Sequence, residues 1–481
     1  MMLKGLNFLK IFAIVLAVLT VLGFALTSCA KGNSEPVGDG EAPEETVSIL
    51  KTELINGDLI VTYSDGRVVN LGPLSGESDS DSLSFYPLPD GTYGITAGNT
   101  IYLEGIAIPA TYKGRAVTRI LNDAFEGLEN LRSVSIPEGI VSIGASAFSG
   151  CVSLESVTIP TTVTAIDASA FYGCKALTEI TVPEGVGSVG SQAFYMCERI
   201  NSINLPNTDI SIGGSAFFGT AYYNNEENWT DGSLYIGKHL ISVKNTVSEM
   251  FKINDGTLTV AKYAFRLCEA VKSVTVPDSV LRIGDLAFAE CSGLTEVAIG
   301  DGSALESLGE GAFMNCGSLL GFDVPRGLAV IPEGAFSGCV SLKCLTVDDA
   351  VNLKAIEKNA FFGCSSLLEI GIADSLETVG ESAFEGCASL VTVNIDLDKC
   401  KLTSIGDRAF FGCKKLEEIG LPMSISSIGA DAFCECAALS KVAYDGTEVE
   451  WKKVTKGANW SGEGGNVQVI FKEITENPDE N

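Results

Sequence analysis

The sequence has little of what catalysis and metal binding most often use. It contains one histidine, His239, and no G-x-S-x-G stretch, so neither a histidine-rich metal site nor the nucleophile elbow of a hydrolase is indicated. Basic residues are also scarce, with 32 lysines and arginines against 61 aspartates and glutamates. Nucleic acid and anionic lipid surfaces are poor partners, because binding phosphate needs concentrated positive charge. We expect a protein that is not an enzyme and has no catalytic residue, no metal and no cofactor.

Only one long apolar run occurs, and it lies near the N-terminus. The run IFAIVLAVLTVLGFAL covers residues 11–26, which is short for a transmembrane helix, and Lys4 and Lys10 precede it. A signal peptide over residues 1–28 is therefore predicted. The sequence Leu-Thr-Ser-Cys that ends at Cys29 resembles the lipobox of bacterial lipoproteins, which implies that Cys29 carries a lipid anchor after cleavage. The alternatives are ordinary secretion, with the cysteine present by chance, and a retained transmembrane anchor.

Between this signal and the main part of the chain, the composition changes twice. Residues 29–45 are rich in glycine, proline and glutamate and have almost no large apolar side chain, which is typical of a flexible acidic tether. Apolar and polar residues then alternate, with an Asn-Gly and an Asp-Gly turn, so a small β segment of two or three strands is predicted over residues 46–74. The sequence SGESDSDS predicts a linker over residues 75–84.

The dominant feature of the sequence is the dipeptide Ala-Phe, which recurs thirteen times at a nearly constant spacing. Most steps between the phenylalanines are 23 residues, a few are 25 or 26, and one is 48. A fixed period of this length indicates a solenoid, in which each repeat forms one coil stacked on the last. The repeat phenylalanines are Phe125, Phe148, Phe171, Phe194, Phe217, Phe265, Phe288, Phe313, Phe336, Phe361, Phe384, Phe410 and Phe433.

One repeat, residues 131–153, shows how a coil is built. Val134 and Ile136 are two residues apart, so both point to the same side of a short strand. Pro137 ends that strand because it has no N–H to donate to a ladder. Eight inward positions in one repeat predict a coil with a single interior. These positions are Leu131, Val134, Ile136, Ile140, Ile143, Ala147, Phe148 and Cys151.

The full pattern L-x-x-[VI]-x-[VIL]-P-x-x-[VI]-x-x-I-G-x-x-A-F-x-G-C resembles the BspA-like leucine-rich repeat over about residues 106–444. Residues 106–120 resemble the family's first coil, and residues 442–460 resemble its closing segment. The resemblance implies a β-rich solenoid, built as a right-handed array of coils with short strands and with caps at both ends. It also implies a bacterial cell-surface protein used for adhesion or protein binding. Leu128 and Thr220 depart from the pattern because they replace the cysteine.

We therefore expect a solenoid of about fourteen or fifteen coils over residues 85–444, followed by a C-terminal cap and tail over residues 445–481. Residues 218–262 break the period as an irregular insertion. The long step of 48 is close to 23 plus 25, which indicates one degenerate coil inside the insertion.

Fifteen cysteines are present, and their spacing accounts for most of them. Eleven lie three residues after a repeat phenylalanine, which predicts a column of buried free thiols that act as small apolar groups. Stacked coils lie ~4.8 Å apart with parallel Cβ vectors, a geometry that suits neither disulfides nor tetrahedral zinc, which are the two alternatives. Cys344, Cys400 and Cys434 lie outside the column, and the sequence leaves their oxidation state open.

Two surfaces are candidates for binding. The residue between the two inward strand positions is small in nearly every coil, which predicts a flat face suited to a broad protein contact. Aromatic residues gather instead in the insertion, where Tyr222, Tyr223, Trp229 and Tyr235 are the candidate ligand-binding residues, with local packing as the alternative. Three aromatic residues that follow successive repeat phenylalanines should stack on one another, for packing or for ligand contact: Tyr172, Tyr195 and Phe218.

These features together predict a lipid-anchored protein of the bacterial cell envelope, exposed at the surface of the outer membrane. Its expected partner is an extracellular or host protein. The acidic balance serves solubility, or it steers basic partners toward the surface. The alternative function is a surface glycan-binding accessory protein of a nutrient-uptake system.

Overall fold

The computed structural model describes residues 49–55, 58–63, 68–73, 77–80, 83–98, 104–347, 350–462 and 467–472. The predicted signal peptide, the acidic tether and Cys29 lie outside the described residues. The first three strands form a sheet of their own in the order β1-β2-β3, where the sequence alternates between apolar and polar residues. They are β1 (Ile49–Ile55), β2 (Asp58–Tyr63) and β3 (Val68–Pro73).

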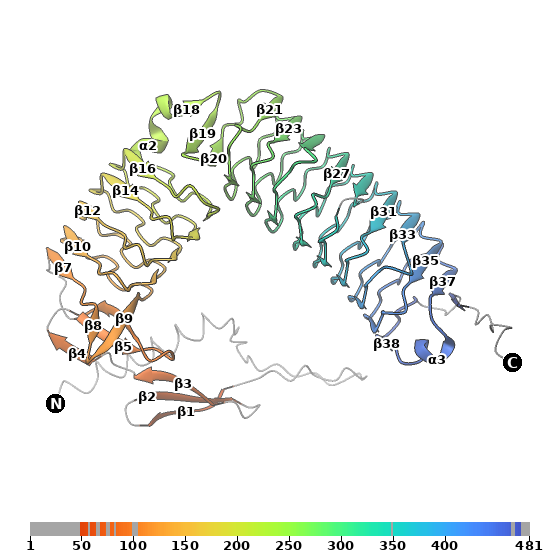
Figure 1. The fold of residues 1–481 in the computed structure, drawn as a ribbon, viewed down its shortest axis with the longest axis horizontal. Helices are drawn as coiled ribbons and strands as arrows, with labels where there is room; N and C mark the ends of the chain where they lie inside the picture. The colour runs from red at the N-terminus through yellow and green to blue at the C-terminus, as the bar shows by residue number, and fades with distance from the viewer. Residues whose placement is uncertain are drawn as a thin grey trace, which may run out of the picture. The chain divides into compact units, whose positions relative to one another are not determined.

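The rest of the described chain is a β-solenoid of about 16 turns with little helix. Each regular coil contributes two short strands, and strands of the same kind pair in parallel with those of neighbouring coils, in several short sheets rather than one continuous sheet. We call each row of such strands a ladder. The strands that contain the two predicted inward positions form the first ladder, which lies along one side of the coils in Figure 1. Its members are β7 (Gly105–Ala107), β10 (Ser133–Ser135), β12 (Ser156–Val157), β14 (Glu179–Thr181), β16 (Ser202–Asn204), β21 (Met250–Lys252), β23 (Ser273–Val276), β25 (Glu296–Ile299), β27 (Gly321–Asp323), β29 (Cys344–Thr346), β31 (Glu369–Ile372), β33 (Thr392–Ile395), β35 (Glu418–Leu421), β37 (Lys441–Tyr444) and β39 (Gln468–Phe471).

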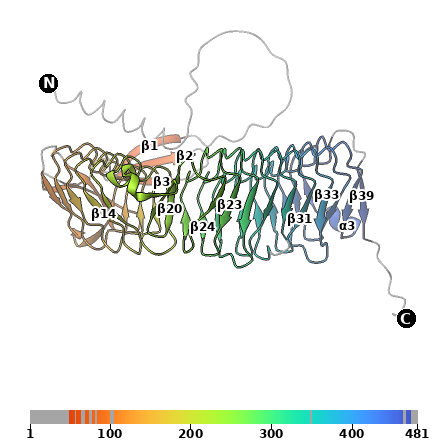
Figure 2. The same cartoon turned by 90° about the horizontal axis from the view of Figure 1, so that it is seen from above.

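The second ladder is built from the residues just before the Ala-Phe turn, and the sequence pattern did not predict it as strand. Its members are β9 (Arg115–Ile120), β11 (Ser142–Ile143), β13 (Ala165–Ile166), β15 (Ser188–Val189), β17 (Ser211–Ile212), β20 (His239–Val243), β22 (Thr259–Val260), β24 (Arg282–Ile283), β26 (Ser307–Leu308), β28 (Val330–Ile331), β30 (Ala355–Ile356), β32 (Thr378–Val379), β34 (Ser404–Ile405), β36 (Ser427–Ile428) and β38 (Thr455–Lys456). Figure 2 shows the coils following one another from β14 to β39.

The pairing register explains why the spacing is so regular. Val134 pairs with Val157 in the first ladder, and Ile143 pairs with Ile166 in the second. In both cases the partners are 23 residues apart, so equivalent positions of successive repeats lie directly above one another. A position of the repeat therefore becomes a column along the solenoid.

The stretch that was predicted to be a linker over residues 75–84 is paired instead. Strand β4 (Glu77–Ser80) lies antiparallel to β5 (Leu83–Pro87), which lies antiparallel to β6 (Tyr93–Ala97). Strand β6 then pairs in parallel with β9 and so adds a turn before the first regular coil, while β8 (Thr111–Tyr112) pairs with β9 from the other side. Pairing uses backbone groups, so a Ser- and Asp-rich segment can still form an edge strand.

The repeat phenylalanines form the centre of the core, as predicted. They are buried, and neighbouring rings are stacked; Phe361 and Phe384, for example, have centroids 5.1 Å apart and planes 1° apart. The column is interrupted once, between Phe217 and Phe265. The described core accordingly falls into two clusters, which meet at the insertion.

The backbone conformation explains why most repeats carry glycine two residues after the phenylalanine. Two residues after the repeat phenylalanine the chain takes a positive φ, as at Gly150, where φ is 72°. Glycine adopts this left-handed conformation without the steric cost that a Cβ brings. Some coils accept a side chain there nonetheless, for example Leu267 at 64° and Glu290 at 63°.

Candidate binding surfaces

The first ladder presents the flat face that the sequence predicted. The small residues between the inward positions are exposed at Ser135, Thr158, Thr181, Asn204, Thr275, Ala298, Asp323, Thr346 and Asn394, and half-buried at Gly371, Gly420 and Ala443. A second outward column was missed, because each first-ladder strand begins with an exposed or half-buried residue. This column carries the carboxylates of Glu179, Glu296, Glu369 and Glu418, of which Glu418 is paired with Lys441 of the same column at 2.8 Å. Negative charge therefore predominates in this column of the flat face.

The insertion contains the degenerate coil that the step of 48 indicated. Strand β20 pairs in parallel with β22, which places Leu240 beside Val260 in the second ladder. Val243 then takes the place of the missing phenylalanine, since its carbonyl accepts a hydrogen bond from the thiol of Cys268, with 3.5 Å between sulfur and oxygen. Phenylalanine carbonyls accept the cysteine of the next coil in the regular part of the array.

Thr220, at the cysteine position, is where the chain leaves the regular coil. Its hydroxyl donates to the carbonyl of Phe217 at 2.8 Å and accepts the N–H of Tyr223 at 3.0 Å. The second bond caps the N-terminus of α2, because a threonine oxygen satisfies a free N–H of the first turn. The chain then passes through α2 (Ala221–Asn224), the 3-10 helix η1 (Glu226–Asn228) and the antiparallel strands β18 (Trp229–Thr230) and β19 (Ser233–Ile236) before β20.

The four aromatic residues predicted to bind a ligand are all half-buried and hydrogen-bonded within the insertion. Tyr222 donates its hydroxyl to the carbonyl of Tyr235 at 3.1 Å, and Trp229 donates Nε1–H to the carbonyl of Tyr223 at 2.8 Å. The hydroxyl of Tyr235 accepts the N–H of Asn254 at 3.1 Å. These bonds hold the insertion together. Tyr222 N–H also donates to the carbonyl of Ile200 at 2.8 Å, and the rings of Tyr222, Tyr223 and Trp229 pack against the core, so the segment lies on the coils rather than projecting as a loop.

The insertion also extends a run of aromatic rings that begins two coils earlier. Centroids are 5.2 Å apart between Tyr172 and Tyr195, 5.4 Å between Tyr195 and Phe218, 5.0 Å between Phe218 and Tyr223, and 5.2 Å between Tyr223 and Trp229. The stacking of the first three on consecutive coils was predicted, but their continuation into the insertion was not. We call these five residues the aromatic row.

The aromatic row shows its edges to solvent. Tyr172 and Phe218 are 38% and 39% exposed, and the planes of Tyr172 and Tyr195 differ by only 7°. Parallel rings stacked at this distance cover each other's faces. A partner would therefore contact the edges of the rings and the hydroxyl groups of Tyr172 and Tyr195. At its far end, the ammonium of Lys244 lies 4.5 Å from the centroid of Trp229.

The cysteine column is confirmed as buried free thiols. All fourteen cysteines among the described residues are free, including Cys344, Cys400 and Cys434. Ten of the eleven column thiols donate to a phenylalanine carbonyl of an earlier coil, as Cys151 does to Phe125 at 3.2 Å, and Cys268 donates to Val243 instead. Burial raises the pKa of the Cys151 thiol to about 12. Cys151 therefore stays protonated at neutral pH. Through their hydrogen bonds the column thiols link neighbouring coils, a role that their sequence spacing did not reveal.

His239, the only histidine, lies fully buried in β20 where the two core clusters meet. Its Nε2–H donates to the carbonyl of Pro206 at 2.8 Å, and Nδ1 has no partner among the described residues. Burial lowers the pKa of this imidazole, which keeps the ring neutral. No nucleophile is hydrogen-bonded to it in the described part of the chain.

Metal sites and membrane-spanning helices are both absent from the described residues. No group of three or more histidine, cysteine, aspartate or glutamate residues there is placed to hold a metal ion. Within the same residues, none of the helices has the length and apolar character needed to cross a membrane.

The repeat itself decides the family. The model of the BspA type leucine-rich repeat region matches six copies, over residues 99–224, 241–352 and 349–452. The chain belongs to this family. BspA-type arrays share the leucine-rich repeat fold, which is generally a protein-binding scaffold and typically not catalytic.

Solved structures of similar proteins come from several bacteria. A leucine-rich repeat protein from Bacteroides ovatus is 23% identical, with 82% of this chain and 100% of that chain covered and a TM-score of 0.33. A leucine-rich cell surface protein from Faecalibacterium prausnitzii is 24% identical, with 80% and 98% covered and a TM-score of 0.29. Because these TM-scores are low, the family assignment rests on the repeat match. A search of curated protein sequences returns no match.

Proposed function

We propose that this BspA-type protein is a non-catalytic, lipid-anchored scaffold that binds an extracellular or host protein at the bacterial surface. The observation that carries the proposal is the aromatic row, because it brings five rings together in one continuous series that is partly exposed to solvent. Protein interfaces draw most of their affinity from a few large anchors, among which tyrosine and tryptophan are enriched.

The geometry of the row favours a protein over a glycan. Sugars bind aromatic side chains by stacking on an open ring face, whereas the stacked part of the row covers both faces of Tyr195 and one face each of Tyr172 and Phe218. Ring edges and tyrosine hydroxyls suit the mixed apolar and polar surface of a protein. The exposed carboxylates on the first-ladder face would favour a basic partner, because opposite charge accelerates association.

The test is a binding screen of the full chain against host matrix proteins and glycans, followed by variants of the row. The double variant Tyr172→Ser and Phe218→Ser removes the two exposed rings and leaves the side-chain hydrogen bonds of Tyr222 and Trp229 in place. We expect it to weaken protein binding at least about tenfold, which is ~1.4 kcal/mol. Met423→Ser, at a separate exposed apolar residue, is the matched control. Unchanged affinity of the double variant, or binding to glycans alone, would contradict the proposal.

The anchor is tested separately, since Cys29 lies outside the described residues. The wild-type protein should carry acyl chains on Cys29 and partition into detergent, because each buried CH₂ adds ~0.8 kcal/mol of membrane affinity. Cys29→Ala should leave an uncut and unlipidated precursor. Mass spectrometry that finds an unmodified Cys29 in the mature protein would refute the anchor and leave the binding proposal untouched.

A further inference from the structure

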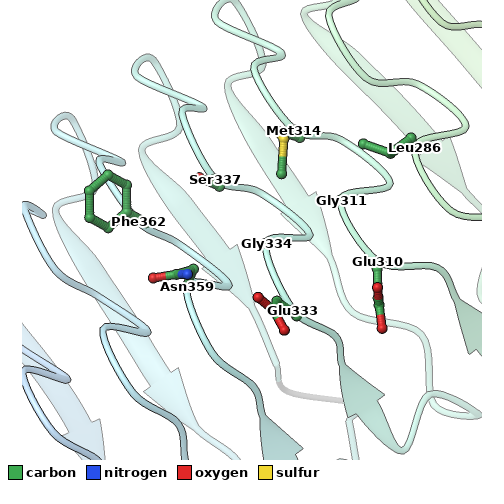
Figure 3. Close-up of a pocket in the computed structure, with 9 residues that line it drawn as sticks. All are labelled: Leu286, Glu310, Gly311, Met314, Glu333, Gly334, Ser337, Asn359 and Phe362. Carbon is green, nitrogen blue, oxygen red and sulfur yellow. The ribbon is translucent and has the colours of Figure 1, made fainter. Parts of the chain in front are cut away.

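A hollow opens on the turn side of four coils (Figure 3), and no residue of the aromatic row lines it. Its floor is the backbone of Gly311 and Gly334, and its volume is about 330 Å³. Leu286, Met314 and Phe362 form apolar walls around this floor. We refer to this feature as the glycine hollow.

The hollow exists because two neighbouring coils carry glycine at a position where other coils carry side chains. This position, two residues before the repeat phenylalanine, has a positive φ throughout, as at Gln192 (58°) and Asn359 (55°). A Cβ on Gly311 would lie 2.7 Å from Cδ2 of Leu286, and one on Gly334 would lie 3.1 Å from Cε of Met314. Side chains at these two positions would fill the floor.

The floor is held in place by hydrogen bonds from each glycine to the following coil. The N–H of Gly311 donates to the carbonyl of Glu333 at 2.9 Å, and the N–H of Gly334 donates to the carbonyl of Lys358 at 3.0 Å. Hydrogen bonds between coils thus fix both glycines before anything binds. A preformed site of this kind loses little conformational entropy on binding, whereas a mobile loop would first have to become ordered.

One side of the hollow is acidic. The exposed side chains of Glu310 and Glu333 lie next to each other along its rim (Figure 3). Neither carboxylate forms an ion pair within the described residues, whereas nearby Asp285 and Glu381 are paired with lysines at 3.2 and 2.8 Å. The rim therefore keeps two negative charges available beside the apolar walls.

We propose that the glycine hollow is a second binding site, which takes an apolar side chain followed by a lysine or arginine of a partner protein. The apolar side chain would lie on the two glycines between Met314 and Phe362, where it is removed from water. The adjacent cation would meet Glu310 and Glu333, which supply complementary charge and orientation. The site is independent of the aromatic row, so either can fail without the other.

The probe is a blocked Ala-Leu-Lys-Ala peptide, with Ala-Leu-Glu-Ala and Ala-Ser-Lys-Ala as controls. The full chain, with its six methionines labelled at the methyl carbon, reports binding through the NMR signal of Met314, which Met314→Leu identifies. We expect a saturable shift of this signal with the Leu-Lys peptide and little shift with either control. No saturable shift, or an equal shift with a control peptide, would overturn the proposal.

Matched variants locate the effect in the hollow. Gly334→Gln should abolish the shift, because it fills the floor with a residue that the fold already accepts at Gln192 in the same conformation. Ser215→Gln makes the same change at a distant coil and should leave the shift unaltered. Glu310→Gln with Glu333→Gln should weaken binding roughly two- to fivefold, as expected for exposed ion pairs. A full response in Gly334→Gln, with its melting curve unchanged, would refute the assignment.

Discussion

Truncation of one ring in the middle of the phenylalanine column tests how the solenoid is held together. Phe313 is 0% exposed, and its ring lies 5.0 Å from Phe288 and 5.3 Å from Phe336, nearly parallel to both. Phe322 of the first ladder packs on it at 5.4 Å with a tilted ring. Phe313→Ala would therefore leave a cavity bounded by three aromatic rings that are themselves buried and fixed.

The magnitude follows from this enclosure. Replacing a buried phenylalanine by alanine removes its burial free energy and leaves a cavity, which together amount to ~3–5 kcal/mol. Collapse of the cavity is limited, because hydrogen bonds such as that from Phe313 N to Ala335 O (2.8 Å) hold the neighbouring coils at their spacing. We expect a loss in the upper half of that range.

Denaturant unfolding measures this loss, with Phe362→Ala as the control. Phe362 is also a phenylalanine, directly follows a repeat phenylalanine and is 43% exposed. Its truncation should lower the free energy of unfolding by clearly less, about 1–2 kcal/mol, since much of the ring is already in water. Equal losses for the two variants would refute the division of the Ala-Phe turn into a buried and an exposed position.

Three further predictions concern thiols, pH and backbone strain. At pH 8 a thiol reagent should label exposed Cys344 in the native protein, whereas Cys151, with its pKa raised to about 12 by burial, should react only on unfolding; mass spectrometry of labelled peptides decides this. Burial lowers the pKa of His239 from 6.5, so the unfolded chain binds the proton more readily and stability should fall as pH drops below 6.5. His239→Gln should flatten this dependence in melts between about pH 5 and 7, and an unchanged slope would exclude His239 as its source. Leu267→Gly should raise the free energy of unfolding by about 0.5–1 kcal/mol, because φ there is 64°; a lower melting temperature would contradict this reading.

Several features of the fold could not be predicted from the sequence, and the structure shows why. Strands such as β11 (Ser142–Ile143) are two residues long, too short for an alternation to show. The bond from Cys151 to the carbonyl of Phe125 joins residues 26 apart and depends on the rise between coils. The polar sequence of β4 gave no sign of pairing, because its partners are backbone groups.

The candidate binding sites were likewise predictable only in part. Tyr222, Tyr223, Trp229 and Tyr235 are clustered in the sequence, so a cluster was predictable. That they pack on the core and hydrogen-bond to one another depends on β20 entering the second ladder. Within the glycine hollow, neither glycine is unusual in its own repeat, and the floor forms only because adjacent coils superimpose the two.

The sequence by itself determined the repeat, its register and its interior. A constant period of apolar residues is enough for this, since parallel in-register pairing turns each repeat position into a column, and Phe148 must lie on Phe125. Only the tertiary structure decided which surfaces those columns create. The aromatic row, the glycine hollow and the junction at His239 each depend on contacts between residues of different coils. Such contacts are set by the stacking distance and by the side chains that neighbouring coils carry, and a single repeat contains neither.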